Sequence, residues 1–98
     1  MSVYAYIRVS TEMQSYASQE HEIRRWCNWK GLAVDKWVSE SVSGTITVEK
    51  RNLGKMIKIM KHGDLLVCTE LSRLGRNMLM IMGILNQCSQ KGISIHTI

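Results

Sequence analysis

The sequence predicts an α/β domain built on a parallel sheet, with strands in the order 2-1-3-4 and helices on both faces. Strand-like and helix-like segments alternate along the whole chain, and such repeats favour parallel strands joined by right-handed crossovers. The segment LLVCT is wholly apolar, as in strands that are covered on both faces. In this strand order the winding direction changes between the first and third strands, which opens a crevice at their carboxyl ends.

The first half of the chain is predicted to form a strand, a helix and a second strand. Residues 2–9 (SVYAYIRV) have the pattern of a buried strand, and residues 15–30 follow helical spacing until Gly31. The alternating segment 32–38 (LAVDKWV) predicts the second strand. The Ser-, Thr- and Gly-containing segment 39–50 then predicts a loop long enough to serve a function.

The second half continues the alternation. Four apolar residues at positions i, i+3, i+4 and i+7 predict an amphipathic helix: Leu53, Met56, Ile57 and Met60. The apolar segment 65–69 predicts the third strand, and 70–77 its exit loop. A helix from Met78 to about Gln90 and a final strand over 93–98 complete the prediction. Because MLMIMGIL is apolar all round, that helix is either simply part of the core or covered by a second surface.

Length and hydropathy predict a single intracellular domain. The 98 residues are 45% hydrophobic, enough for a core of ordinary size. No segment approaches the roughly 20 apolar residues of a membrane span, and the start lacks the pattern of a secretion signal. We therefore expect a cytoplasmic protein without a membrane partner.

The cysteines and histidines predict neither disulfides nor a metal site. Three cysteines lie in apolar surroundings without C-x-x-C spacing: Cys27, Cys68 and Cys88. Three histidines lie far apart in the chain: His21, His62 and His96. We expect buried free thiols and no bound metal.

The charge predicts a polyanionic partner. The formal net charge is +5, and basic residues gather at 24–30, 50–61 and 73–76. We expect the fold to bring these three groups onto one side, which makes nucleic acid the favoured partner.

Polar residues follow the first and third strands. Arg8 and Ser10 share a face at the end of the first strand, and three more polar residues follow the third: Ser72, Arg73 and Arg76. The strand order brings the two groups together, so we expect one site. Alternatively, Thr11 and Gln14 form only a helix capping box, and RLGR is a solvated basic loop.

A serine among arginines suits phosphoryl transfer better than acyl transfer. A serine that attacks acyl groups normally has an imidazole or lysine base beside it. Forked guanidinium donors match phosphate oxygens and stabilise charge that develops in the transition state. Gly75 within RLGR also permits close approach of the backbone to a ligand.

Four segments form a pattern in their order and spacing: YAYIRVSTEMQ (4–14), SG (43–44), GDLLVCTELSRLGRN (63–77) and KGISI (91–95). Together they resemble the catalytic domain of serine recombinases of the resolvase and DNA invertase family. The resemblance covers residues 1–98. It implies site-specific DNA recombination in which Ser10 attacks a DNA phosphodiester, forms a 5′-phosphoserine link and frees a 3′ hydroxyl before strand exchange and religation. It implies no metal, nucleotide or other cofactor.

The resemblance also assigns roles to residues. The phosphate-binding and activating arginines would be Arg8, Arg73 and Arg76. The supporting residues would be Tyr6, Gln14 and Gln19. Where the family commonly has an aspartate this chain has Ser72, and Glu70 is the candidate replacement. Lys50 and Arg51 both remain candidates for the basic residue after the SG loop, as a phosphate contact or as a solvated helix start.

The resemblance further implies assembly of the full-length protein into dimers that pair as tetramers. The long dimerisation helix and the DNA-binding domain of the family would lie beyond residue 98, so we expect the chain to be an inactive fragment on its own. Two other functions stay open. The chain is alternatively the catalytic domain of a large serine integrase or serine transposase, or, in another class, a non-catalytic α/β module that binds a phosphate ligand or a protein.

Overall fold

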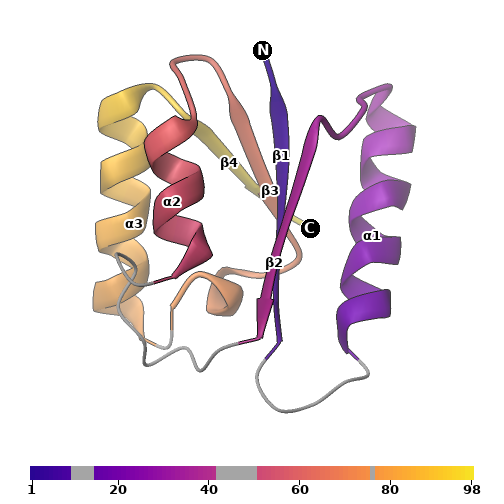
Figure 1. Cartoon of the computed structure of the whole chain (residues 1–98), viewed down its shortest axis with the longest axis horizontal. Helices are drawn as coiled ribbons and strands as arrows, with labels where there is room; N and C mark the ends of the chain where they lie inside the picture. Colours follow the sequence, from indigo (N-terminus) through magenta and orange to yellow (C-terminus); the bar gives the residue numbers. More distant parts are fainter. Residues whose placement is uncertain (10–14, 42–50, 76) are drawn as a thin grey trace.

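The computed structural model describes residues 1–9, 15–41, 51–75 and 77–98 and contains the predicted four-stranded sheet. The strands are β1 (Val3–Val9), β2 (Lys36–Ser41), β3 (Leu65–Cys68) and β4 (Ser94–Thr97). They are ordered β2-β1-β3-β4, and every pairing between them is parallel. Their carboxyl ends therefore share one edge of the sheet (Figure 1).

Helices cover both faces of the sheet, as predicted (Figure 1). They are α1 (Ser15–Lys30), α2 (Asn52–Ile59) and α3 (Met78–Lys91), and a short 3-10 turn, η2 (Leu71–Arg73), follows β3. Helix α1 lies on one face, and α2 and α3 lie on the other. Among the described residues, no helix is long and apolar enough to cross a membrane.

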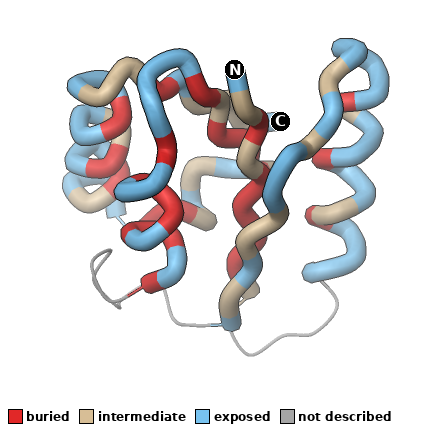
Figure 2. The backbone as a smooth tube through the Cα atoms, turned by 45° about the horizontal axis from the view of Figure 1, so that its top comes forward, coloured by how far each residue is buried: buried red, intermediate tan, exposed pale blue. Residues whose placement is uncertain are grey.

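Each face of the sheet has its own apolar core, and Figure 2 shows where the buried residues lie along the chain. On the α1 side, Ile23 and Cys27 pack against sheet residues that include Ala5 and Ile7. The larger cluster on the other side holds buried residues of α2, α3 and the sheet, among them Tyr6, Leu53, Met56, Ile57, Leu66 and Ile84. Helical spacing of apolar residues in α2 thus produced the predicted buried stripe.

The second strand differs from its prediction. It begins at Lys36 rather than at residue 32, and it continues to Ser41. Leu32 and Val34 pack against the core on the α1 side without joining the sheet. Pairing with β1 begins only after Asp35, whose carboxylate accepts a hydrogen bond from the Val3 amide at 2.7 Å. The shift places Glu40 inside the strand, where it pairs with Arg8.

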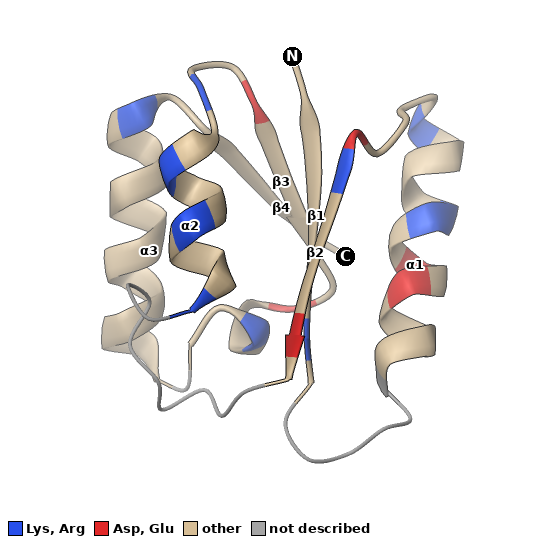
Figure 3. Ribbon diagram, viewed as in Figure 1, with Lys and Arg blue, Asp and Glu red and all other residues tan. Residues whose placement is uncertain are grey.

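The expectation that three basic groups share one side is wrong. The basic residues of α1 and those of α2 lie on opposite faces of the sheet (Figure 3). Among the described residues of the three groups, Arg73 contacts Arg8 directly, and Arg51 donates to the same Arg73 carbonyl that Arg8 does. The positive charge that matters to the site is therefore local to the carboxyl edge.

The prediction of buried free thiols is confirmed for all three cysteines. Burial raises the pKa of the Cys68 thiol to about 12, so this thiol is a packing group rather than a nucleophile.

Helix α3 is only partly covered by the described residues. Its buried stripe includes Ile81, Ile84 and Cys88. On another face Met78 is 65% exposed, Leu79 84% and Met82 55%. Of the two alternatives for this helix, burial in the core alone therefore does not account for these three exposed side chains.

Candidate functional site

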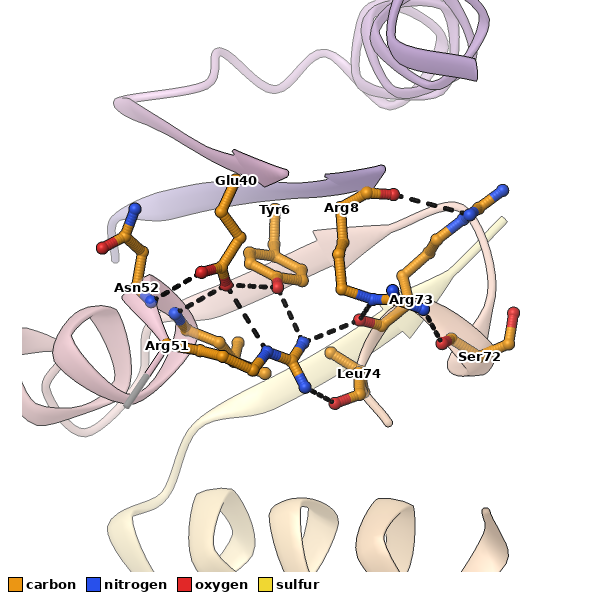
Figure 4. Close-up of polar contacts among 9 residues, drawn as sticks. Tyr6, Arg8, Glu40, Arg51, Asn52, Ser72, Arg73 and Leu74 are labelled. Atoms are coloured by element: carbon orange, nitrogen blue, oxygen red, sulfur yellow. Dashed lines mark hydrogen bonds and ion pairs between the residues drawn. The ribbon is translucent and has the colours of Figure 1, made fainter. Parts of the chain in front are cut away.

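The candidate site lies at the carboxyl edge of the sheet, where β1 and β3 end. Tyr6 and Arg8 are two residues apart on β1 and project from the same face. The turn η2 brings Ser72 and Arg73 beside them (Figure 4). The predicted meeting of the first and third strand exits is therefore seen for these residues.

The side chain of Arg8 contacts the backbone of Arg73, and the side chain of Arg73 contacts the backbone of Arg8. Arg8 Nε donates a hydrogen bond to the carbonyl of Arg73 at 2.9 Å, and Arg73 Nη1 donates to the carbonyl of Arg8 at 3.4 Å. Arg8 is 8% exposed. The two guanidiniums are thus fixed relative to each other at the end of β1, just before residue 10.

Arg8 and Arg51 together donate hydrogen bonds to three successive backbone carbonyls. Two of these carbonyls belong to η2, and the third belongs to the residue that follows it. Arg8 Nη2 donates to Ser72 at 2.9 Å, and Arg51 donates to Arg73 at 2.9 Å and to Leu74 at 2.7 Å. A short turn leaves its last carbonyls without backbone donors, and here charged side chains supply them. The turn is thereby tied to the elements around it.

Tyr6, Glu40 and Arg51 form a buried polar network behind this turn (Figure 4). The Tyr6 hydroxyl donates to Glu40 Oε2 and accepts from Arg51 Nη2 at 2.7 Å. Arg51 Nε lies 3.6 Å from Glu40 Oε2, and the two side chains are 0% and 6% exposed. Burial raises the pKa of Tyr6 above its usual range, so the hydroxyl remains protonated and able to donate.

Glu40 is a residue of the site that the sequence analysis missed. It also accepts from the backbone amides of Asn52 at 2.8 Å and Leu53 at 3.2 Å, and so caps the start of α2. Its register partner on β1 is Arg8. Extending the second predicted strand by two residues would have placed a carboxylate beside Arg8 and revealed it.

The charges of the described site are unequal. Three guanidiniums (Arg8, Arg51 and Arg73) face two carboxylates: Glu40, and Glu70, whose Oε1 lies 3.1 Å from Arg73 Nη2. Burial and, second, the charge of Arg51 lower the pKa of Arg8. Confined positive charge of this kind is relieved when an anion binds.

The structure describes some of the remaining predicted site residues, and others lie outside the described part of the chain. Gln19 Nε2, from α1, donates to the Arg8 carbonyl at 3.1 Å. Ser72 is exposed and takes part through its carbonyl, whereas Glu70 meets Arg73 through its carboxylate. Four of the predicted residues lie outside the described part of the chain: Ser10, Gln14, Lys50 and Arg76.

Gly75 lies where the loop after η2 packs closely against α3. A Cβ at this buried position would lie 2.8 Å from Cγ and Sδ of Met80. Close packing of the loop against α3 therefore favours a glycine here, and the approach of a ligand to this backbone stays a prediction.

The chain matches a family model and curated relatives over nearly its whole length. The family described as "Resolvase, N terminal domain" matches residues 3–98. Transposon Tn2501 resolvase of Escherichia coli is 33% identical over 97 residues, which are 96% of this chain and 48% of that protein. Transposon Tn552 DNA-invertase BinR of Staphylococcus aureus is 30% identical over 93 residues, 95% and 45% of the two chains. The chain thus spans about half the length of these relatives.

Two solved structures share the fold. The C-terminal catalytic domain of ISC1926 TnpA, an IS607-like serine recombinase, aligns with 99% of this chain and 69% of its own, with a TM-score of 0.80 and 23% identity. The N-terminal catalytic domain of TP901-1 integrase aligns with 99% of this chain and 76% of its own, with a TM-score of 0.81 and 16% identity. The chain belongs to the resolvase N-terminal domain family, and its fold is that of a serine recombinase catalytic domain.

Proposed function

We propose that this chain is the catalytic domain of a site-specific DNA recombinase, in which Ser10 is the nucleophile. The observation that carries the proposal is the mutual contact of Arg8 and Arg73 at the end of β1. Residue 10 follows Arg8 by two positions, so the two guanidiniums lie at the strand end from which the chain continues to the serine. Family membership and the resolvase and DNA-invertase relatives support the same function.

In the proposed reaction, the Ser10 hydroxyl oxygen forms a bond to phosphorus while the bond from phosphorus to the 3′ oxygen breaks. The products are a 5′-phosphoserine link and a 3′ hydroxyl, and the reverse reaction rejoins exchanged strands. Arg8, Arg73 and Arg76 bind the phosphate and stabilise the charge that develops on its oxygens. No cofactor is required.

We propose further that Glu70, rather than Ser72, supplies the acidic group near the leaving oxygen. The Glu70 carboxylate pairs with Arg73 and is 57% exposed, so it is accessible beside an arginine that is proposed to bind the phosphate. A serine hydroxyl donates a hydrogen bond but is not a strong acid. Changing Glu70→Gln should therefore slow cleavage and alter its pH profile, whereas Ser72→Ala should change it little.

A small recombinase of the resolvase and invertase kind is the favoured form. Relatives at 30–33% identity carry those names, whereas the integrase and IS607-like neighbours support only the fold. A non-catalytic module that binds a phosphate ligand or a protein gives no joint purpose to Ser10, Arg8 and Arg73.

DNA is the proposed substrate, and the full-length protein is proposed to act in the cytoplasm as a dimer that pairs into a tetramer. The exposed apolar side chains of Met78, Leu79 and Met82 on α3 support a protein contact there. The assembly is tested by the mass of the full-length protein, alone and on DNA.

The test of the proposed function is covalent trapping. Full-length protein is mixed with a nicked substrate that loses the released 3′ end, and the adduct is resolved under denaturing conditions. Ser10→Ala should bind DNA normally and form no adduct, because binding depends on other residues. Ser89→Ala, an exposed serine of α3, is the matched control and should behave as the wild type. An adduct that survives in Ser10→Ala ends the proposal.

A further inference from the structure

Arg51 has no solvent-exposed surface, although it is a charged residue in a chain proposed to bind DNA. Its relative exposure is 0%, the lowest of any charged residue among those described. Nη1 donates to the Leu74 carbonyl at 2.7 Å, and Nη2 donates to the Tyr6 hydroxyl at 2.7 Å and the Arg73 carbonyl at 2.9 Å. Both of its terminal nitrogens are therefore engaged inside the protein.

The partners of Arg51 are themselves fixed. Glu40, 3.6 Å from Arg51 Nε, also accepts from Tyr6 and from two amides of α2. If Arg51 turned outward to meet a phosphate, it would leave the buried Glu40 carboxylate without its counter-ion. Breaking a buried pair in this way is strongly unfavourable.

What Arg51 holds is the backbone from which Arg73 projects. The Arg73 carbonyl receives one hydrogen bond from Arg51 and one from Arg8, both at 2.9 Å. Among the described residues, the Leu74 carbonyl beside it accepts its side-chain hydrogen bond from Arg51. The direction in which the Arg73 side chain leaves the turn therefore depends on Arg51.

We propose that Arg51 is a positioning residue: it holds the turn at 71–74 so that Arg73 meets the scissile phosphate, and it does not contact that phosphate itself. This inference rests on the proposed function. It separates Arg51, whose side chain is 0% exposed, from Arg73, whose side chain is 24% exposed, and from Arg8, which is 8% exposed. The sequence left Arg51 either as a phosphate contact or as a solvated helix start. A buried Arg51 that positions the turn is neither of these.

The experiment measures single-turnover cleavage by full-length protein on two substrates, one with a normal scissile phosphate and one with a neutral methylphosphonate. The variants are Arg51→Gln, Arg73→Lys, Arg73→Gln and the double change of Arg51→Gln with Arg73→Lys. Arg25→Gln removes the same charge from an exposed site on α1 and is the matched control. Folding of each variant is checked by its thermal melt.

Arg51→Gln should slow cleavage about 100-fold, the order expected from a displacement of about 1 Å, and by the same factor on both substrates. Arg73→Gln should be partly rescued by the methylphosphonate, because less charge then needs to be neutralised. The cleavage rate of the double variant should fall by less than the product of the factors by which the two single changes lower it. The reason is that Arg73 is already misplaced when Arg51 is absent. If Arg51 had a merely structural role, the cleavage rate of the double variant would fall by the full product of the two single factors.

Three results would overturn the inference. Selective rescue of Arg51→Gln by the methylphosphonate would make Arg51 a phosphate ligand, and multiplicative losses would make it only structural. A wild type that forms no adduct on either substrate would remove the proposed function as well, which distinguishes the two failures. If Arg51→Gln does not fold, Tyr6→Phe replaces it: this change removes one acceptor of Arg51 and should show the same equal loss on both substrates and the same coupling to Arg73→Lys.

Discussion

Arg8 and Arg73 each donate a side-chain hydrogen bond to the backbone carbonyl of the other, at 2.9 Å and 3.4 Å. The contact joins the end of β1 to the turn after β3, two segments 65 residues apart. Each guanidinium thus holds the site together, and in the proposed reaction it also presents charge to the phosphate. A single ammonium group has neither the reach nor the planar fork to do both.

We therefore predict that Arg8→Lys and Arg73→Lys, and Arg76→Lys by its place in the same motif, each slow DNA cleavage by roughly 10- to 100-fold, since a hydrogen bond to a charged group contributes about 1.5–3 kcal/mol. Single-turnover cleavage of a suicide substrate measures the effect. Arg25→Lys, on the exposed surface of α1, is the control. Cleavage close to the wild-type rate in all three variants would mean that they are only surface charges.

Glu40→Gln tests the network behind the turn. The carboxylate accepts hydrogen bonds from two backbone amides of α2 and from Tyr6, and it pairs with Arg51. The side-chain amide of glutamine has only one oxygen to accept these bonds, and its NH₂ group would face other hydrogen-bond donors. We expect the free energy of unfolding to fall by about 1–3 kcal/mol, measured by urea denaturation. Glu20→Gln breaks an exposed pair with Arg24 and should cost well under 1 kcal/mol. Equal losses would show that burial of Glu40 contributes nothing.

The strand order and the helix positions were predictable because they depend on periodicity. The first helix was predicted over 15–30 and occupies Ser15–Lys30. Its apolar spacing and the glycine after it are local features. The second strand was misplaced because alternation alone does not separate a strand from a connection that packs on the core, as Leu32 and Val34 do.

The site was predictable only in part, for a different reason. Strand ends could be assigned to one edge, so Arg8 and Arg73 were expected to meet. The burial of Arg51 depends on Glu40 and Tyr6, which approach it from β2 and β1. The other partners of Arg51 and Arg8 include backbone carbonyls, which every residue has, so no residue pattern identifies them.

Asp64 should contribute to the pH dependence of stability. Hydrogen bonds from the backbone amides of Lys61 and Ser2 lower its pKa. A carboxyl with a lowered pKa in the folded state stabilises above its unfolded pKa, near 3.9, and loses that contribution as the pH falls through the folded value. Asp64→Asn should thus be less stable than the wild type at pH 7, by urea denaturation.

The difference in the free energy of unfolding between Asp64→Asn and the wild type should narrow below about pH 4. At that pH the Asp64 carboxyl of the unfolded wild type begins to take up its proton, which the folded state still resists. Glu22→Gln changes an exposed carboxyl on α1 and is the control, with an acid transition like that of the wild type. A difference between Asp64→Asn and the wild type that stays constant from pH 7 to pH 3 would refute the assignment.

Gly31 and Gly92 end α1 and α3 with nearly the same left-handed backbone, at φ +72° and +76°. They differ in their surroundings: a Cβ at Gly31 meets nothing within 4 Å, whereas one at Gly92 would overlap the His62 ring. Gly31→Ala should therefore show the cost of the backbone alone, about 1 kcal/mol, or a fall of about 4–8 °C in Tm. Gly92→Ala should cost about 0.5–1.5 kcal/mol more, because His62 must leave its rotamer.

The double variant of Gly92→Ala with His62→Ala separates these two contributions. Against the His62→Ala background, Gly92→Ala should lower Tm by the same amount as Gly31→Ala does in the wild type, since only the positive φ then opposes the alanine side chain. Thermal unfolding of the four variants and the wild type measures this cycle. If Gly92→Ala costs no more than Gly31→Ala while His62 is present, the ring moves aside freely, and close packing at this helix end contributes nothing to stability.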